Sequence, residues 1–213
     1  MQTVAALYVE HGGVYYGLPG VEPWGLPERD ARDYAGPHPV VAHPPCARWG
    51  RYWSGGPSAK VRRKLGDDDG CFEAALATVR RHGGVLEHPE ASHAWRWFGL
   101  ERPPKPGGWI EADEHGWTCC VEQGHYGHRA RKATWLYLVG PKPPDLTWGP
   151  AAAGVRLEPG FHSRQERAEA TPEQKLIKRL SPREAKATPL PFRDLLLSMA
   201  RSARRELDQE ART

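Results

Sequence analysis

The chain has no long apolar run, no charged-then-apolar leader at its N-terminus and no Cys-x-x-Cys pair. The first absence argues against a transmembrane helix, which needs about 20 consecutive apolar residues. The second argues against a secretory signal, and the third argues against a disulfide scaffold built from the four cysteines. We therefore expect a cytoplasmic protein with reduced thiols and no membrane partner.

Proline, glycine and tryptophan are by contrast abundant, at 21, 23 and 9 of 213 residues. This composition indicates many turns around a core rich in aromatic side chains. The length predicts one main domain, and the sequence changes character near residue 150. We expect a core over residues 1–150, followed by a linker and a basic helical C-terminal extension over 151–213. The net charge of +4 is compatible with DNA as a partner without requiring it.

A strand–helix–strand unit is the clearest pattern in the chain. "VVAH" at 40–43 is typical of a buried strand, "DDDGCFEAALATVRRHGG" at 67–84 predicts a helix, and "GGVLEHP" at 83–89 predicts a second strand. The helix begins with acids that suit its dipole and carries one apolar face, formed by Phe72, Ala75, Leu76 and Val79. A crossover of this kind makes the two strands parallel and brings both carboxyl ends to one edge.

Further elements complete the expected α/β fold, which we take to have a mostly parallel, Rossmann-like sheet. "VAALYV" at 4–9 is typical of a buried strand, followed by about thirty irregular residues. A short helix is expected over 91–100, two strands separated by a basic turn over 117–140, and an amphipathic helix over 192–209. The stretch from Val155 onward carries an excess of positive charge equal to that of the whole chain. Those cations either contact phosphates or form the solvated face of a packed helix.

The unit places Cys46 and Glu87 after neighbouring strands, so we expect them to share one edge of the sheet. A thiol and a carboxylic acid suit chemistry at carbon 5 of a pyrimidine. The thiolate adds to C6 and the acid protonates or hydrogen-bonds N3, which makes C5 nucleophilic. The alternatives are that Cys46 is a small buried side chain and that Glu87 is an ordinary loop carboxylate.

Arginines and tryptophans cluster directly after this cysteine. We expect Arg48 and Arg51 to hold phosphates and Trp49 to stack on an extruded base, since a base must leave the duplex to be attacked. The alternative is that the tryptophans are half-buried core residues.

Four blocks in order, "VVAHPPCARWG", "VLEHP", "EQGHYGHRARKATWLYLVGPKPPDL" and "SPREAKATPLPFRDLLLSMA", resemble the DNA cytosine-5 methyltransferases, especially the compact methyltransferase-like proteins of phages. The resemblance implies a transferase that modifies DNA, with Cys46 as nucleophile and Glu87 as the acid at N3. It also implies nucleic-acid contacts from the basic turn that contains Arg129, Arg131 and Lys132.

The cofactor half departs from this family. S-adenosylmethionine is the cofactor that the resemblance implies, but the thirty residues between the first two strands leave no space for two further strand–helix units. The Gly pair of "EHGGVYYGLPG" is by itself a turn signal. His88 also stands where the family has Asn. We therefore expect S-adenosylmethionine to bind weakly or not at all.

Two other interpretations remain open at this stage. The chain could be a catalytically lapsed member that only binds nucleic acid or a partner protein. A zinc site could form among His115, Cys119, Cys120, His125 and His128, but their spacing fits no finger pattern and adjacent strand residues point to opposite faces. We expect no metal.

Overall fold

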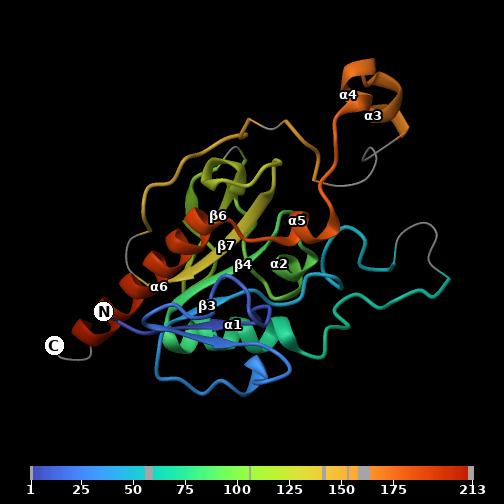
Figure 1. The fold of residues 1–213 in the computed structure, drawn as a ribbon. Coiled ribbons are helices and arrows are strands. Elements are labelled where there is room, and N and C mark those ends of the chain that lie inside the picture. The colour runs from blue at the N-terminus through green and yellow to red at the C-terminus, as the bar shows by residue number, and fades with distance from the viewer. Residues whose placement is uncertain are drawn as a thin grey trace.

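The computed structural model describes residues 2–55, 60–105, 107–140, 143–152, 154–157 and 164–210. These residues form one seven-stranded sheet with helices packed on it, in the order β2-β1-β3-β4-β7-β6-β5 (Figure 1). The predicted α/β class is confirmed. The strands are β1 (Val4–Leu7), β2 (Val21–Trp24), β3 (Val40–Ala42), β4 (Gly84–Pro89), β5 (Trp109–Glu111), β6 (Trp117–Glu122) and β7 (Ala133–Val139).

The sheet is mixed, so the expectation of a mostly parallel sheet is wrong. β2, β1, β3 and β4 run parallel, whereas β7 is antiparallel to both β4 and β6, and β5 is antiparallel to β6. The reason lies in the connection between β6 and β7, which spans only residues 123–132 and includes the short η2 (Gln123–Tyr126). Such a connection is too short for a crossover, so the chain turns back antiparallel.

β2 is a strand that the sequence pattern did not indicate. It lies at the edge of the sheet and pairs in parallel with β1, within the stretch expected to be irregular. Its four residues are all half-buried, so burial does not alternate along the strand. Pro23 also lacks the backbone N–H that a strand residue normally donates. The chain then passes through η1 (Ala31–Asp33) to β3.

The strand–helix–strand unit of β3, α1 (Cys71–His82) and β4 is confirmed. The predicted apolar face of α1 is buried, and β3 and β4 pair in parallel. Gly84 opens β4 with a φ of 121°, and a Cβ there would lie 2.0 Å from the carbonyl oxygen of Val40. Only glycine allows this approach of the two backbones.

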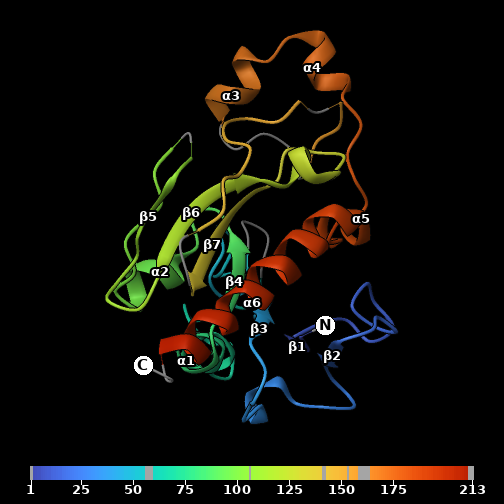
Figure 2. The same ribbon diagram turned by 90° about the vertical axis from the view of Figure 1, so that its left-hand side faces the viewer.

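Helices cover both faces of the sheet. Along β4, Leu86 lies in the apolar cluster that contains α1 and part of α2 (His93–Trp97), whereas Val85 lies in the cluster that contains α6 (Leu190–Glu210). Figure 2 shows α6 running along the sheet, with α1 beyond its C-terminal part. No helix in the described part of the chain is long and apolar enough to cross a membrane.

The C-terminal stretch does not all lie apart from the core. α3 (Arg164–Glu169) and α4 (Pro172–Leu176) project beyond the sheet in Figures 1 and 2, and α5 (Pro182–Lys186) leads back to α6. Phe192 and Leu196 of α6 are fully buried against the sheet. The domain boundary near residue 150 stays a prediction, but the helix of the second part packs on the sheet of the first.

Candidate functional site

The carboxyl edge of β3 and β4 brings two predicted site residues to one region. Ala42 pairs with Leu86 in the parallel register, so His43 and Glu87 follow side by side. Pro44 and Pro45 end the strand, because proline supplies no backbone donor for the ladder. Cys46 follows as an exposed residue, and its carbonyl oxygen accepts hydrogen bonds from the amides of Trp49 and Gly50.

The carboxylate of Glu87 is largely enclosed, with 13% of its side chain exposed. Its Oε2 lies 2.9 Å from Nδ1 of His43, and its Oε1 accepts a hydrogen bond of 3.2 Å from Nε2 of Gln123. The same Gln123 amide donates to the hydroxyl of Thr134 on β7. Burial raises the pKa of Glu87, but the hydrogen bond and charge of His43 outweigh it, so the pKa lies below its usual value. Glu87 is therefore held as a carboxylate.

A tyrosine completes this hydrogen-bond chain. The hydroxyl of Tyr15 lies 2.8 Å from Nε2 of His43. Burial, followed by the charge of Glu87, raises the pKa of Tyr15, so its hydroxyl keeps its proton and can donate. His43 donates to Glu87 whenever its Nδ1 carries a proton, and its Nε2 then shares the other hydrogen bond with the hydroxyl of Tyr15. The chain thus fixes the imidazole and points a donor at the carboxylate.

The thiol of Cys46 is electrostatically coupled to Glu87 and to Lys132. Burial of the sulfur by surrounding protein, followed by the charge of Glu87, raises the pKa of Cys46, whereas Lys132 lowers it. Burial in turn lowers the pKa of Lys132, and the charges of Glu87 and Cys46 oppose that effect. The resting thiol is therefore protonated, and of the charged groups around it Glu87 disfavours the thiolate whereas Lys132 favours it.

Lys132 is more enclosed than its place in a basic turn suggests. It is half-buried, and its Nζ faces the carbonyl oxygens of Lys186 and Ala187 at 3.5 and 3.4 Å. These carbonyls belong to the last turn of α5 and the residue after it, where the helix dipole favours a cation. The segment before α6 thereby fixes the ammonium group of Lys132.

The other cations predicted to contact nucleic acid have protein partners. Arg129 forms an ion pair with Glu184 at 2.6 Å, and Arg131 forms one with Glu122 at 3.2 Å. Arg48 donates to the carbonyl oxygen of Trp53 at 3.3 Å. Arg51 is exposed. The turn between β6 and β7 therefore offers less free positive charge than its sequence suggests.

Trp49 is a core residue, which corrects the expectation that it stacks on a base. Only 2% of it is exposed, and its Nε1 donates to Oδ2 of Asp68 at 2.7 Å. The same carboxylate oxygen accepts the backbone amide of Phe72 in the first turn of α1. Trp49 thus fastens the loop after Cys46 to the start of that helix.

His88, where the resembled family has Asn, is structural. It is fully buried between Phe72 and Trp95, and its Nδ1 lies 2.8 Å from the hydroxyl of Ser92. Burial lowers the pKa of His88 to about 4, so it is neutral at physiological pH. It shapes the segment after β4 and does not face the Glu87 side of the sheet.

The residues present do not form a nucleoside-cofactor cradle at the ends of β1 and β2. The described connection between these strands is a series of turns, so no helix N-terminus follows β1 directly. The order of the strands changes direction between β1 and β3, and such a switch point is where α/β sheets usually bind ligands. The buried Tyr15 occupies this place, bonded to His43. We therefore derive no step through S-adenosylmethionine.

The histidines and cysteines considered for zinc are separated by the fold. His115 precedes β6, whereas His125 and His128 follow it at the opposite end of the strand. Cys119 and Cys120 lie in the apolar clusters on opposite faces of the sheet. Across the described ranges of the chain, no group of three or more His, Cys, Asp or Glu is placed to hold a metal ion.

His43 sets the protonation of Glu87, and this gives a pH-dependent prediction. Because the native pKa of Glu87 is below the ordinary 4.5, its carboxylate stabilises the fold above that pH. This contribution is lost as the pH falls through the native pKa. The variant His43→Ala leaves Glu87 buried but removes its hydrogen-bond donor, so we expect the pKa of Glu87 to rise. The protein should then lose less stability on acidification than the wild type does.

The measurement is the free energy of unfolding from urea titrations between neutral pH and about pH 3, where carboxylates titrate. The control is the same His43→Ala change in a Glu87→Gln background, where it should leave the pH dependence unaltered. If the free energy of unfolding fell equally with pH in the wild type and in His43→Ala, the role assigned to His43 would be refuted.

Comparison with known proteins gives no family for this chain. No protein-family model matches it, and no curated protein matches it.

Proposed function

We propose that the protein is a DNA-modifying enzyme that attacks a pyrimidine base through Cys46, in the manner of the cytosine-5 methyltransferase superfamily. The observation that carries the proposal is that an exposed cysteine residue and an enclosed carboxylate stand at the carboxyl edge of two adjacent parallel strands. Nucleophilic catalysis needs such a pair when the resting nucleophile is protonated. Lys132 adds a cation that favours the thiolate.

Each group has a defined part in the addition step. The S–H bond of Cys46 breaks and its proton passes through the Glu87 carboxylate to N3 of the base. The sulfur bonds to C6, the electron pair of the C5–C6 double bond shifts to C4–C5, and the C4–N3 pair moves to N3. The resulting enamine is nucleophilic at C5. His43 and Gln123 orient Glu87 throughout, and each carboxylate oxygen retains a second lone pair for the base.

Hydrogen exchange at C5 tests this function without any cofactor. The enamine can take a proton from water at C5, lose the original hydrogen and then expel the thiol. We expect the protein to release tritium into water from DNA that contains 5-tritiated cytosine, and Cys46→Ala to release none. DNA with 5-fluorocytosine traps the enzyme covalently only after an electrophile other than a proton has added at C5, because the thiol is otherwise expelled again, so this second assay needs the physiological donor. Absence of tritium release with the folded wild type would reject the proposal.

The alternative is a binding protein without catalytic activity. The raised pKa of Cys46 and the missing cofactor cradle favour it. It predicts DNA binding without exchange and without dependence on Cys46. The physiological electrophile would decide the type of modification, and titration calorimetry with S-adenosylmethionine should give weak or no heat of binding.

A further inference from the structure

The segment that follows Cys46 is basic and free of acids. Between residues 47 and 66 the sequence has no Asp or Glu and six cations. All of them except Arg48 are exposed. An exposed run of one charge sign, carried on a loop beside the candidate nucleophile, complements a polyanion. The cations are Arg48, Arg51, Lys60, Arg62, Arg63 and Lys64.

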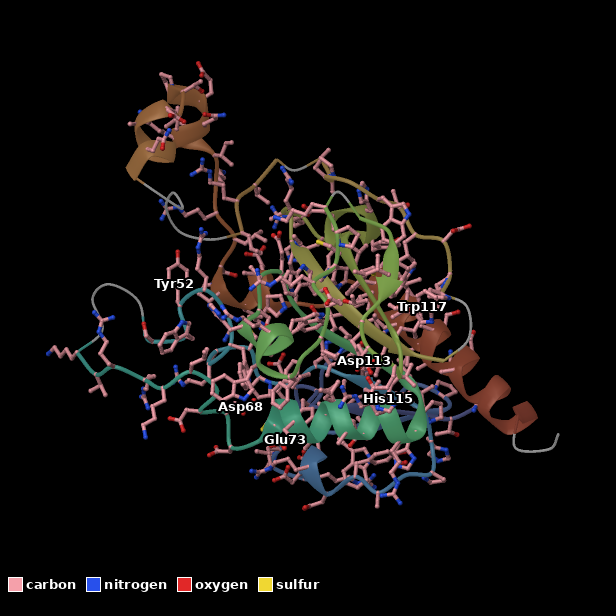
Figure 3. All side chains as sticks on the ribbon, turned by 180° about the vertical axis from the view of Figure 1, so that it is seen from behind. Tyr52, Asp68, Glu73, Asp113, His115 and Trp117 are labelled. Carbon is pink, nitrogen blue, oxygen red and sulfur yellow. The ribbon has the colours of Figure 1, made fainter. Side chains whose placement is uncertain are left out.

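The base of this loop is anchored to the body of the protein. The amide of Gly66 donates to the carbonyl oxygen of Arg48 at 3.1 Å, and the amide of Arg63 donates to that of Ser54 at 3.2 Å. The buried Trp49 fixes the first turn to Asp68. Figure 3 shows Tyr52 on the same flank of the molecule as Asp68 and Glu73, away from Asp113 and His115. Both ends of the loop are thus fixed to the body of the protein, and its first cations follow Cys46 directly in the chain.

Exposed aromatic rings accompany the cations. Trp97 of α2 is 61% exposed and its ring packs edge-on against Trp49, with centroids 5.7 Å apart. It lines a shallow hollow with Leu65, His93 and Arg96. Tyr52 is 49% exposed. An indole left open beside cations is the combination that binds unpaired bases, whose faces stack on the ring while phosphates meet the charges.

We propose that the described residues 48–55 and 60–65 of this loop, together with Trp97, form a binding surface for single-stranded DNA, an inference that rests on the proposed function. In a duplex the base faces are covered, so an exposed indole would find no stacking partner. The base attacked by Cys46 must also be out of the stack. We assign DNA binding to this surface rather than to the turn between β6 and β7, because Arg129 and Arg131 there form ion pairs with Glu184 and Glu122.

The test compares two matched charge variants by fluorescence anisotropy on a labelled oligodeoxycytidylate over a range of salt concentrations. Arg62→Gln/Arg63→Gln removes two cations from the loop, and Arg129→Gln/Arg131→Gln removes two from the other turn. We expect the first to weaken binding and to lower the salt slope by about 1.4, since each phosphate contact on a single strand contributes about 0.7. The second should leave affinity and slope unchanged. Trp97→Ala should weaken binding by about 5- to 150-fold, the cost of one base stack.

Three outcomes would overturn the surface. They are equal losses from both double variants, tighter binding of duplex DNA or of an RNA of the same sequence, and no binding of the oligonucleotide by the wild type. The two proposals fail separately, because Cys46→Ala should bind the oligonucleotide like the wild type. Binding that depends on the loop but is not accompanied by tritium release would support the binding surface and reject the proposed catalytic function. Tritium release that Arg62→Gln/Arg63→Gln does not affect would reject only the binding surface.

Discussion

Glu87→Gln is expected to lower the rate of C5 hydrogen exchange by about 10²- to 10⁴-fold, the usual contribution of a positioned general acid or base. The amide keeps the shape of the side chain but can neither take the proton of Cys46 nor deliver it to N3. Its oxygen can still accept from Gln123, and its NH2 group can donate to His43 if the imidazole adopts its other tautomer. The fold should therefore persist while proton transfer is lost. Tritium release under single-turnover conditions measures the effect.

The matched control is Glu122→Gln, a nearly buried carboxylate at the end of β6 that pairs with Arg131. It should retain the exchange rate within a few-fold. If Glu87→Gln exchanged as fast as this control, Glu87 would not be the acid, and the thiol proton would have another acceptor.

Phe192→Ala is expected to lower the free energy of unfolding by about 3–5 kcal/mol, the cost of deleting a fully buried phenyl ring. Phe192 lies in the first turn of α6, is completely buried, and contacts the ring of Tyr126 with centroids 5.8 Å apart. Its cluster includes Val85 and Leu136 from the centre of the sheet. The loss should be read from the midpoint and slope of a urea titration.

Leu190→Ala provides the comparison two positions earlier, because that side chain is 53% exposed. Exposed substitutions usually change stability by no more than about 0.5 kcal/mol. Small and equal effects at both positions would show that α6 does not pack on the sheet in solution. The charged stretch after residue 150 would then be an independent tail, as its composition alone allows.

Several parts of this protein were predictable from local sequence. The α1 helix, its buried face and the two flanking strands follow from apolar spacing, glycine stops and acids at the helix start. The shared edge of Cys46 and Glu87 follows from the length of one crossover, which makes β3 and β4 parallel. Cys119 and Cys120 separate to opposite faces because the side-chain period of a strand is two.

The environment of that edge was decided by tertiary structure. Tyr15, His43 and Gln123 come from three separate segments, and no local pattern predicts that they meet at Glu87. The position of His43 directly after a buried strand was the only available signal. The ion pairs of Arg129 and Arg131 depend likewise on where Glu184 and Glu122 are brought by the fold.

The sequence by itself determined which residue types stand at the ends of which strands, because periodicity, turn residues and crossover length act over a few tens of residues. Tertiary structure alone decided that the sheet is mixed, that Trp49 is buried, that Lys132 meets the carbonyl oxygens after α5 and that Trp97 stays exposed. These outcomes depend on long-range packing, in which burial and pairing are set by neighbours distant in the chain. The charge and the reactivity of a side chain at this edge are properties of those neighbours as much as of the residue itself.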